Sequence, residues 1–128
     1  MKEKLQTLLK NSYSPYSNFK VASIVEMKDG TYFSGINVEN ASYGATICAE
    51  RVAITSAVAK GYRKGDFKGI YVMVDSPKIS TCCFLCRQLL VEFFEPDCFV
   101  ICMNQNGEQK EFRVEEMCPS PFDQGDLE

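Results

Sequence analysis

The segments CAERVAITSAVAK (48–60) and CCFLCRQLLVEFF (82–94) decide the fold, because each combines helical apolar spacing with cysteines near its first turn. Apolar residues recur along one side of each segment: Val52, Ile54, Ala57 and Val58 in the first, and Leu89, Leu90, Phe93 and Phe94 in the second. Gly61 follows the first segment where a helix would stop, and Ser80-Thr81 stands where a cap of the second would lie. We therefore expect two helices that begin beside cysteines.

The rest of the chain alternates between helical and extended patterns. Residues 3–12 have the spacing of an amphipathic helix, whereas residues 39–47 look irregular. Turns at Asp29-Gly30 and Asn106-Gly107 suggest two hairpins. Strand composition is found at 20–27, 31–38, 69–74, 98–103 and 110–114. Strands interleaved with helices predict an α/β sandwich, formed by a single domain over residues 1–128.

Composition narrows the choice of partner and compartment. The chain of 128 residues is 45% hydrophobic and 24% charged, and its formal net charge is −3. This balance argues against a partner with a phosphate backbone, so we expect a small-molecule substrate and no nucleic acid. No apolar run approaches the length needed to cross a membrane, and the first residues lack a secretory pattern. The expected location is the cytoplasm.

Seven cysteines and no histidine limit the chemistry. The absence of imidazole excludes hydrolases built on Ser-His or Cys-His pairs. An odd cysteine count in a reducing compartment disfavours disulfides, which leaves metal binding, catalysis or plain burial. We assign Cys98, Cys102 and Cys118 to burial, because they have no partner at metal-ligand spacing.

Cys48, Cys83 and Cys86 have the pattern of a zinc site. Each lies near an expected helix start, where free N–H groups favour thiolate over thiol. Three protein ligands leave one zinc position for water, whereas four would close a structural site. Glu50 lies two residues from a ligand, within reach for general acid/base work. Arg51 could offset the excess negative charge by donating hydrogen bonds to the sulfurs.

Four stretches together resemble the cytidine deaminase family. Their order and spacing match the family over about residues 5–127: SPYSNF (14–19), NVENASY (37–43), CAER (48–51) and CFLCRQ (83–88). The resemblance implies a three-layer α-β-α sandwich, with a five-stranded mixed sheet and helices on both faces. It also implies one zinc ion per subunit. Hydroxide generated at zinc would attack C4 of the pyrimidine while Glu50 moves a proton to N3 and then to the departing amine.

The same resemblance implies a set of nucleoside contacts. Phe19 would stack on the base, while the backbone of Ala49 and the carboxyl of Glu50 would read its polar edge. Asn37 and Glu39 would hold the ribose. The substrates would be cytidine and 2′-deoxycytidine, as in pyrimidine salvage.

Relatives of this small-subunit type imply a homotetramer with shared active sites. In such an assembly Ala41, Tyr43 and Phe122 would reach the nucleoside bound by a neighbouring subunit. Arg87 is expected to cap or pair within its own subunit.

Other interpretations remain open at this stage. A deaminase of another aminopyrimidine nucleoside, such as a blasticidin-type compound, would share the zinc residues. A catalytically impaired member would bind zinc or nucleoside without turnover. Two departures bear on the pocket: Cys82 and Phe84 stand where the family usually has proline and glycine. Proline suits the first helical position because its missing N–H costs nothing there. If the family's glycine is needed for a positive φ, Phe84 would be strained at that position.

Overall fold

A mixed five-stranded sheet forms the centre of the computed structural model, which describes residues 1–128. The strands are β1 (Val21–Met27), β2 (Tyr32–Ile36), β3 (Phe67–Val74), β4 (Phe99–Met103) and β5 (Gln109–Arg113). They lie in the order β2-β1-β3-β4-β5, and only β3 and β4 run parallel. The two predicted hairpins are confirmed, with Gly30 and Gly107 at positive φ in their turns.

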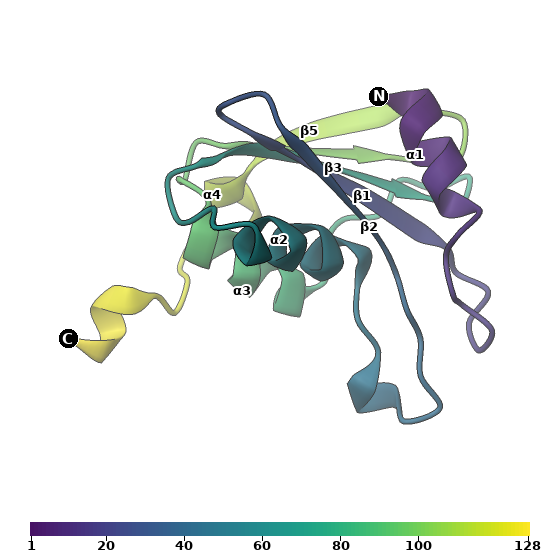
Figure 1. The fold of residues 1–128 in the computed structure, drawn as a ribbon, viewed down its shortest axis with the longest axis horizontal. Coiled ribbons are helices and arrows are strands. Elements are labelled where there is room, and N and C mark those ends of the chain that lie inside the picture. Colours follow the sequence, from purple (N-terminus) through teal and green to yellow (C-terminus); the bar gives the residue numbers. More distant parts are fainter.

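Helices cover both faces of this sheet, which confirms the three-layer expectation (Figure 1). Helix α1 (Lys2–Leu9) packs on one face, whereas α2 (Ala49–Ala59) and α3 (Phe84–Phe93) lie side by side on the other. The remaining helical turns are short: η1 (Tyr43–Ala45), α4 (Val114–Met117) and η2 (Gln124–Leu127). None of the helices combines the length and the apolar character needed to span a bilayer.

Strand β1 shows why the sheet needs cover on both faces. Its side chains alternate between the two faces because a strand has a two-residue repeat. Ala22 and Ile24 pack under α1, whereas Val25 and Met27 belong to the larger core formed with α2 and α3. The expectation of a doubly covered strand is also met by the neighbouring β3, which is buried at six of its eight positions. Consequently α2 and α3 pack against the buried side chains of β1 and β3.

Gly35 of β2 allows α2 to approach the sheet closely. A Cβ atom at this position would lie 2.6 Å from the backbone nitrogen of Ala53 and would overlap the carbonyl oxygen of Ala49. Both of those atoms are backbone atoms of α2, which cannot move aside without shifting the helix. Gly35 therefore sets the depth at which the start of α2 lies against the sheet.

The start of α3 differs from the sequence prediction. Ser80-Thr81 does not cap this helix: its N-cap is Cys83, which makes no side-chain cap hydrogen bond, and Phe84 is the first helical residue. The Thr81 hydroxyl instead accepts a hydrogen bond from Arg87. Cys82, expected at the first helical position, precedes the cap because the chain stays extended through Cys83 (ψ 165°). The first helix is also shorter than predicted, since α1 ends at Leu9.

Replacing Gly35 with alanine should destabilise the protein, because the added methyl group must displace the α2 backbone. We expect a loss of about 1–3 kcal/mol in the free energy of unfolding, the usual cost of overpacking. Urea unfolding measures it. Gly44→Ala is the matched control, because a Cβ there meets no atom within 4 Å. Equal stability of the two variants would contradict a packing role for Gly35.

Candidate active site

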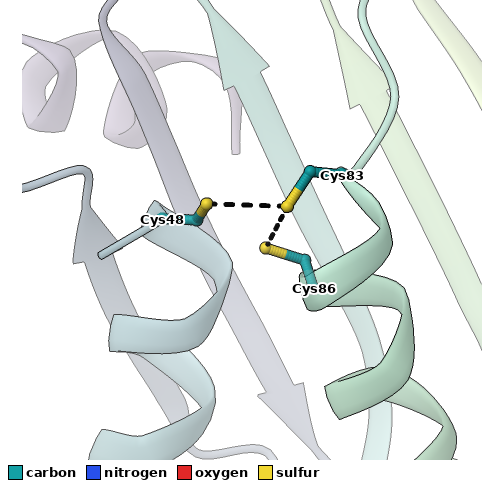
Figure 2. A group of neighbouring side chains, drawn as sticks. All are labelled: Cys48, Cys83 and Cys86. Carbon is teal, nitrogen blue, oxygen red and sulfur yellow. Dashed lines mark hydrogen bonds between the residues drawn. The ribbon is translucent and has the colours of Figure 1, made fainter. Parts of the chain in front are cut away.

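The first turns of α2 and α3 bring three cysteine sulfurs together (Figure 2). Cys48 is the N-cap of α2, Cys83 is the N-cap of α3, and Cys86 is the third residue of α3. Cys86 is fully buried, Cys48 is partly buried and Cys83 is exposed. Figure 2 shows the three sulfurs pointing toward one another from the two neighbouring helix starts. The prediction that both cysteine groups lie at helix starts is confirmed.

The spacing of the three sulfurs fits one zinc ion. The Sγ atoms of Cys48 and Cys83 are 3.6 Å apart, and those of Cys83 and Cys86 are 3.4 Å apart. All three lie within 4.8 Å of one another. Tetrahedral zinc with bonds of about 2.3 Å to sulfur separates its sulfur ligands by about 3.8 Å. No fourth cysteine, carboxylate or histidine joins the group, so these three residues would leave a zinc ion one position for water.

The local electrostatics favour ionised sulfur at Cys48. A hydrogen bond from the Cys86 thiol, with smaller contributions from Cys83 and Arg51, lowers the pKa of Cys48 to about 5. The same Cys48–Cys86 hydrogen bond raises the pKa of Cys86, because Cys86 is the donor and loses the bond when it loses its proton. The Arg51 guanidinium also donates to the carbonyl oxygen of Thr46 at 3.0 Å, which holds the cation beside the sulfurs.

Glu50 is a buried carboxyl group beside these sulfurs. Its side chain is almost inaccessible to solvent, and it occupies the second position of α2. Burial raises the pKa of Glu50, and the negative charge of Cys48 adds to this effect. A carboxyl group with a raised pKa can both accept and release a proton close to neutral pH.

A pocket opens directly onto Glu50 and two of the cysteines. Twelve residues line it: Phe19, Val21, Asn37, Thr46, Cys48, Ala49, Glu50, Val72, Val74, Ser80, Thr81 and Cys83. The pocket therefore combines an apolar wall from β1 and β3 with the polar ends of α2 and of the segment before α3. Six of the residues predicted from the sequence meet here: Phe19, Asn37, Cys48, Ala49, Glu50 and Cys83.

Asn37 connects the pocket wall to the loop that carries Phe19. Its amide nitrogen donates to the carbonyl oxygen of Phe19 at 2.8 Å, and its amide oxygen accepts from the backbone of Val21 at 3.0 Å. Ser12 donates to the same oxygen. The ring of Phe19, 41% exposed, is thus held at the mouth of the pocket.

Glu39 lies outside this pocket, in an adjoining hollow. Its carboxylate accepts hydrogen bonds from the backbone nitrogens of Tyr16 and Ser17, and also from the Ser17 hydroxyl. The Ser17 hydroxyl bond is the main cause that lowers the pKa of Glu39. Thr46 lines both the pocket and the hollow, so the two are neighbours.

Three further predicted residues are absent from the lining of the pocket, although Tyr43 lines the adjoining hollow. Ala41 and Tyr43 are exposed on the loop between β2 and α2, where Tyr43 contacts the Tyr16 ring edge-on. Phe122 is exposed on the C-terminal tail, and its carbonyl oxygen accepts from Gln88. Figure 1 shows the loop and the tail extending away from the sheet.

The remaining cysteines and Arg87 have structural positions. Cys98 and Cys102 are buried in the main core, as expected, whereas Cys118 is only partly buried. No disulfide is present. Arg87 donates to the carbonyl oxygens of Cys82 and Met117, both at 2.8 Å, which confirms its expected role within the subunit.

Phe84 does not disturb the pocket. Its backbone has no positive φ, so this position needs no glycine. The ring is 75% exposed and lies under the Arg87 guanidinium, 4.5 Å from ring centroid to Cζ. It is absent from the pocket lining. The strain considered for this departure is therefore not found.

Sequence reasoning missed several lining residues. The sequence pattern indicates a helix cap at Ser80 and Thr81 and ordinary strand core at Val72 and Val74, yet all four line the pocket. Thr46 fell in a segment that looked irregular. Its position two residues before Cys48, the N-cap of α2, is the one signal that could have found it.

Comparisons with known proteins agree with this geometry. The family model of the cytidine and deoxycytidylate deaminase zinc-binding region matches residues 1–103. A cytidine deaminase of Mycoplasma genitalium is 38% identical, over 94% of this chain and 91% of that protein. The crystal structure of a cytidine deaminase from Burkholderia pseudomallei has a TM-score of 0.89 and 39% identity, covering 94% of each chain. A blasticidin-S deaminase of Bacillus cereus is 33% identical, over 80% of this chain and 76% of that protein.

A sandwich fold with three thiols and a buried carboxyl at converging helix starts defines a metal-dependent deaminase. The chain belongs to the cytidine and deoxycytidylate deaminase family, and its three clustered cysteines can hold the zinc ion of that family.

Proposed function

We propose that this protein converts cytidine and 2′-deoxycytidine to uridine and 2′-deoxyuridine, with release of ammonia, in pyrimidine salvage. The observation that carries the proposal is the placement of a buried Glu50 carboxyl beside three clustered thiols on one pocket. Zinc bound there supplies a Lewis acid that makes water a nucleophile near neutral pH. The zinc ligands we propose are Cys48, Cys83 and Cys86.

Glu50 is the proposed catalytic proton carrier. It takes one proton from the water that attacks C4 and passes it to ring nitrogen N3. It then takes the second proton, from the new hydroxyl on C4, and delivers it to the amine, which leaves as ammonia. The burial that raises the pKa of Glu50 makes its protonated form accessible, which these transfers require. The apolar side chains of Val72 and Val74 exclude bulk water from the same pocket. Arg51 keeps the sulfurs ionised through its proximity to Cys48.

The proposed nucleoside contacts follow the pocket outward from Glu50. The base packs against the Phe19 ring, and its polar edge faces the Ala49 backbone and Glu50. The ribose lies between Asn37 on the pocket wall and Glu39 in the adjoining hollow, which Thr46 connects. The low pKa of Glu39 supports this role, because a carboxylate accepts hydrogen bonds from ribose hydroxyls.

We also propose a cytoplasmic homotetramer with shared active sites. Two exposed aromatic side chains support it: Tyr43 is 79% exposed and Phe122 is 59% exposed, on segments that extend from the subunit. Ala41 lies on the same loop as Tyr43. Exposed aromatic side chains on projecting segments are typical anchors of protein interfaces. In the tetramer these residues would close the pocket of a neighbour.

Glu50→Gln should retain one zinc ion per chain but lose about 10²- to 10⁴-fold in kcat, because the amide cannot carry the proton. Cys86→Ala should lose both zinc and activity. Metal analysis and the absorbance change on deamination of cytidine, deoxycytidine and blasticidin S measure these effects. Cys98→Ala, which removes a buried cysteine outside the metal group, should behave as wild type. Turnover of blasticidin S alone would replace the substrate proposal, and no turnover of any substrate would refute it.

Phe122→Ala should raise KM for cytidine while the protein keeps the mass of four chains. The reason is that Phe122 contacts a neighbour's nucleoside rather than its own pocket. Light scattering after size exclusion gives the mass. Leu127→Ala is the control, because Leu127 is an exposed apolar residue of the same tail. A fully active monomer is the outcome that contradicts shared sites.

A further inference from the structure

A single hydrogen bond joins the C-terminal tail, residues 119–128, to the rest of the protein. Its donor is the side-chain amide nitrogen of Gln88, which lies 2.6 Å from the carbonyl oxygen of Phe122. The other hydrogen bonds of the tail join its own residues to one another, and none of its charged groups forms an ion pair. Within the tail only Pro121 is partly buried, and every other residue is exposed. The position of the tail therefore depends largely on Gln88.

Gln88 lies on the helix that carries two of the clustered cysteines. It follows Cys86 by two residues, which places it about 3 Å further along the axis of α3. The preceding residue, Arg87, donates to the carbonyl oxygen of Met117 at 2.8 Å, just before the tail begins. Two successive side chains of α3 thus hold backbone carbonyl groups at positions 117 and 122. The tail is attached to the same helix as the metal-binding group, both at its root and at its aromatic residue.

The chain between these two attachments is short and stiff. Residues 118–121 have the sequence CPSP, and each proline fixes its own φ. With both ends of this segment held, the Phe122 ring has few directions in which to point. Loss of the Gln88 hydrogen bond would release one end only. The ring would then sample more orientations while the tail stays attached through Met117.

We propose that Gln88 is a positioning residue for Phe122, an inference that rests on the shared active sites of the proposed function. Its amide holds the Phe122 carbonyl so that the ring projects toward the pocket of a neighbouring subunit. The ring is 59% exposed and is thus available to a second chain. A ring that is oriented in advance loses less conformational entropy when it closes over a nucleoside. Gln88 itself belongs neither to the pocket lining nor to the metal-binding group.

Kinetics of the zinc-loaded protein test this role. Gln88→Glu keeps the length of the side chain but removes the N–H donor, so KM for cytidine should rise about threefold to tenfold, the effect of one hydrogen bond. The kcat, the zinc content and the mass of four chains should stay as in wild type. Gln88→Lys retains an N–H donor and should keep KM within about twofold of wild type. Gln109→Glu adds the same charge at the exposed start of β5 and should leave KM unchanged.

A double-mutant cycle separates positioning of the ring from a general effect on the site. In the Phe122→Ala background, Gln88→Glu should not change KM further, because the ring that Gln88 orients is absent. Wild-type KM in Gln88→Glu alone, or an equal rise in both backgrounds, would overturn the proposal. Loss of zinc or of kcat in Gln88→Glu would also overturn it, because Gln88 would then support α3 rather than the tail.

Tryptophan fluorescence tests the attachment of the tail without any turnover. The chain has no tryptophan, so Leu127→Trp places a single reporter on the tail. Addition of Gln88→Glu should lower the fluorescence anisotropy of this tryptophan, because one of the two attachments is released. Unchanged anisotropy would overturn the proposal. If the wild-type protein deaminates no substrate, the proposed function fails and the role of Gln88 in it fails as well, whereas a fall in anisotropy would still establish the attachment.

Discussion

The convergence of two helix starts on three sulfurs is the constraint on which the rest of the structure depends. Three thiolates in close contact repel one another, so their assembly needs compensating positive charge. The free N–H groups at the starts of α2 and α3, the Arg51 guanidinium and a zinc ion supply it. Both helices must therefore lie on the same face of the sheet, with their first turns level. Gly35 lets α2 lie close to the sheet. Strands β3 and β4, which precede and follow α3 in the sequence, pair in parallel and so fix the face on which α3 lies.

The cluster of three cysteines could be predicted because its signal is local. Cys48, Cys83 and Cys86 stand at helix starts that the apolar spacing already reveals, and Glu50 follows from its distance to Cys48 in the sequence. The hairpins were predictable for the same reason, since strand composition and turn residues act over short ranges, whereas the three-layer arrangement followed from the resemblance to the deaminase family. Such features depend on neighbours in the chain.

Contacts between distant segments could not be predicted in this way. Helix α3 starts later than its apolar spacing predicts, because Arg87 hydrogen-bonds to Cys82 and Thr81, which precede the helix. The outward position of Phe84 likewise follows from its stacking with Arg87. The zinc group and the pocket therefore differ in how far sequence alone determines them.

X-ray absorption at the zinc edge of the protein purified without chelator tests the central claim most directly. Three thiolates with one open position predict three sulfur neighbours at about 2.3 Å and one oxygen or nitrogen neighbour at about 2.0 Å. Addition of a nucleoside should change the light-atom shell and leave the sulfur shell as it was. Four sulfur neighbours would contradict the claim, because a fourth thiol such as Cys82 would then close the position that the reaction needs.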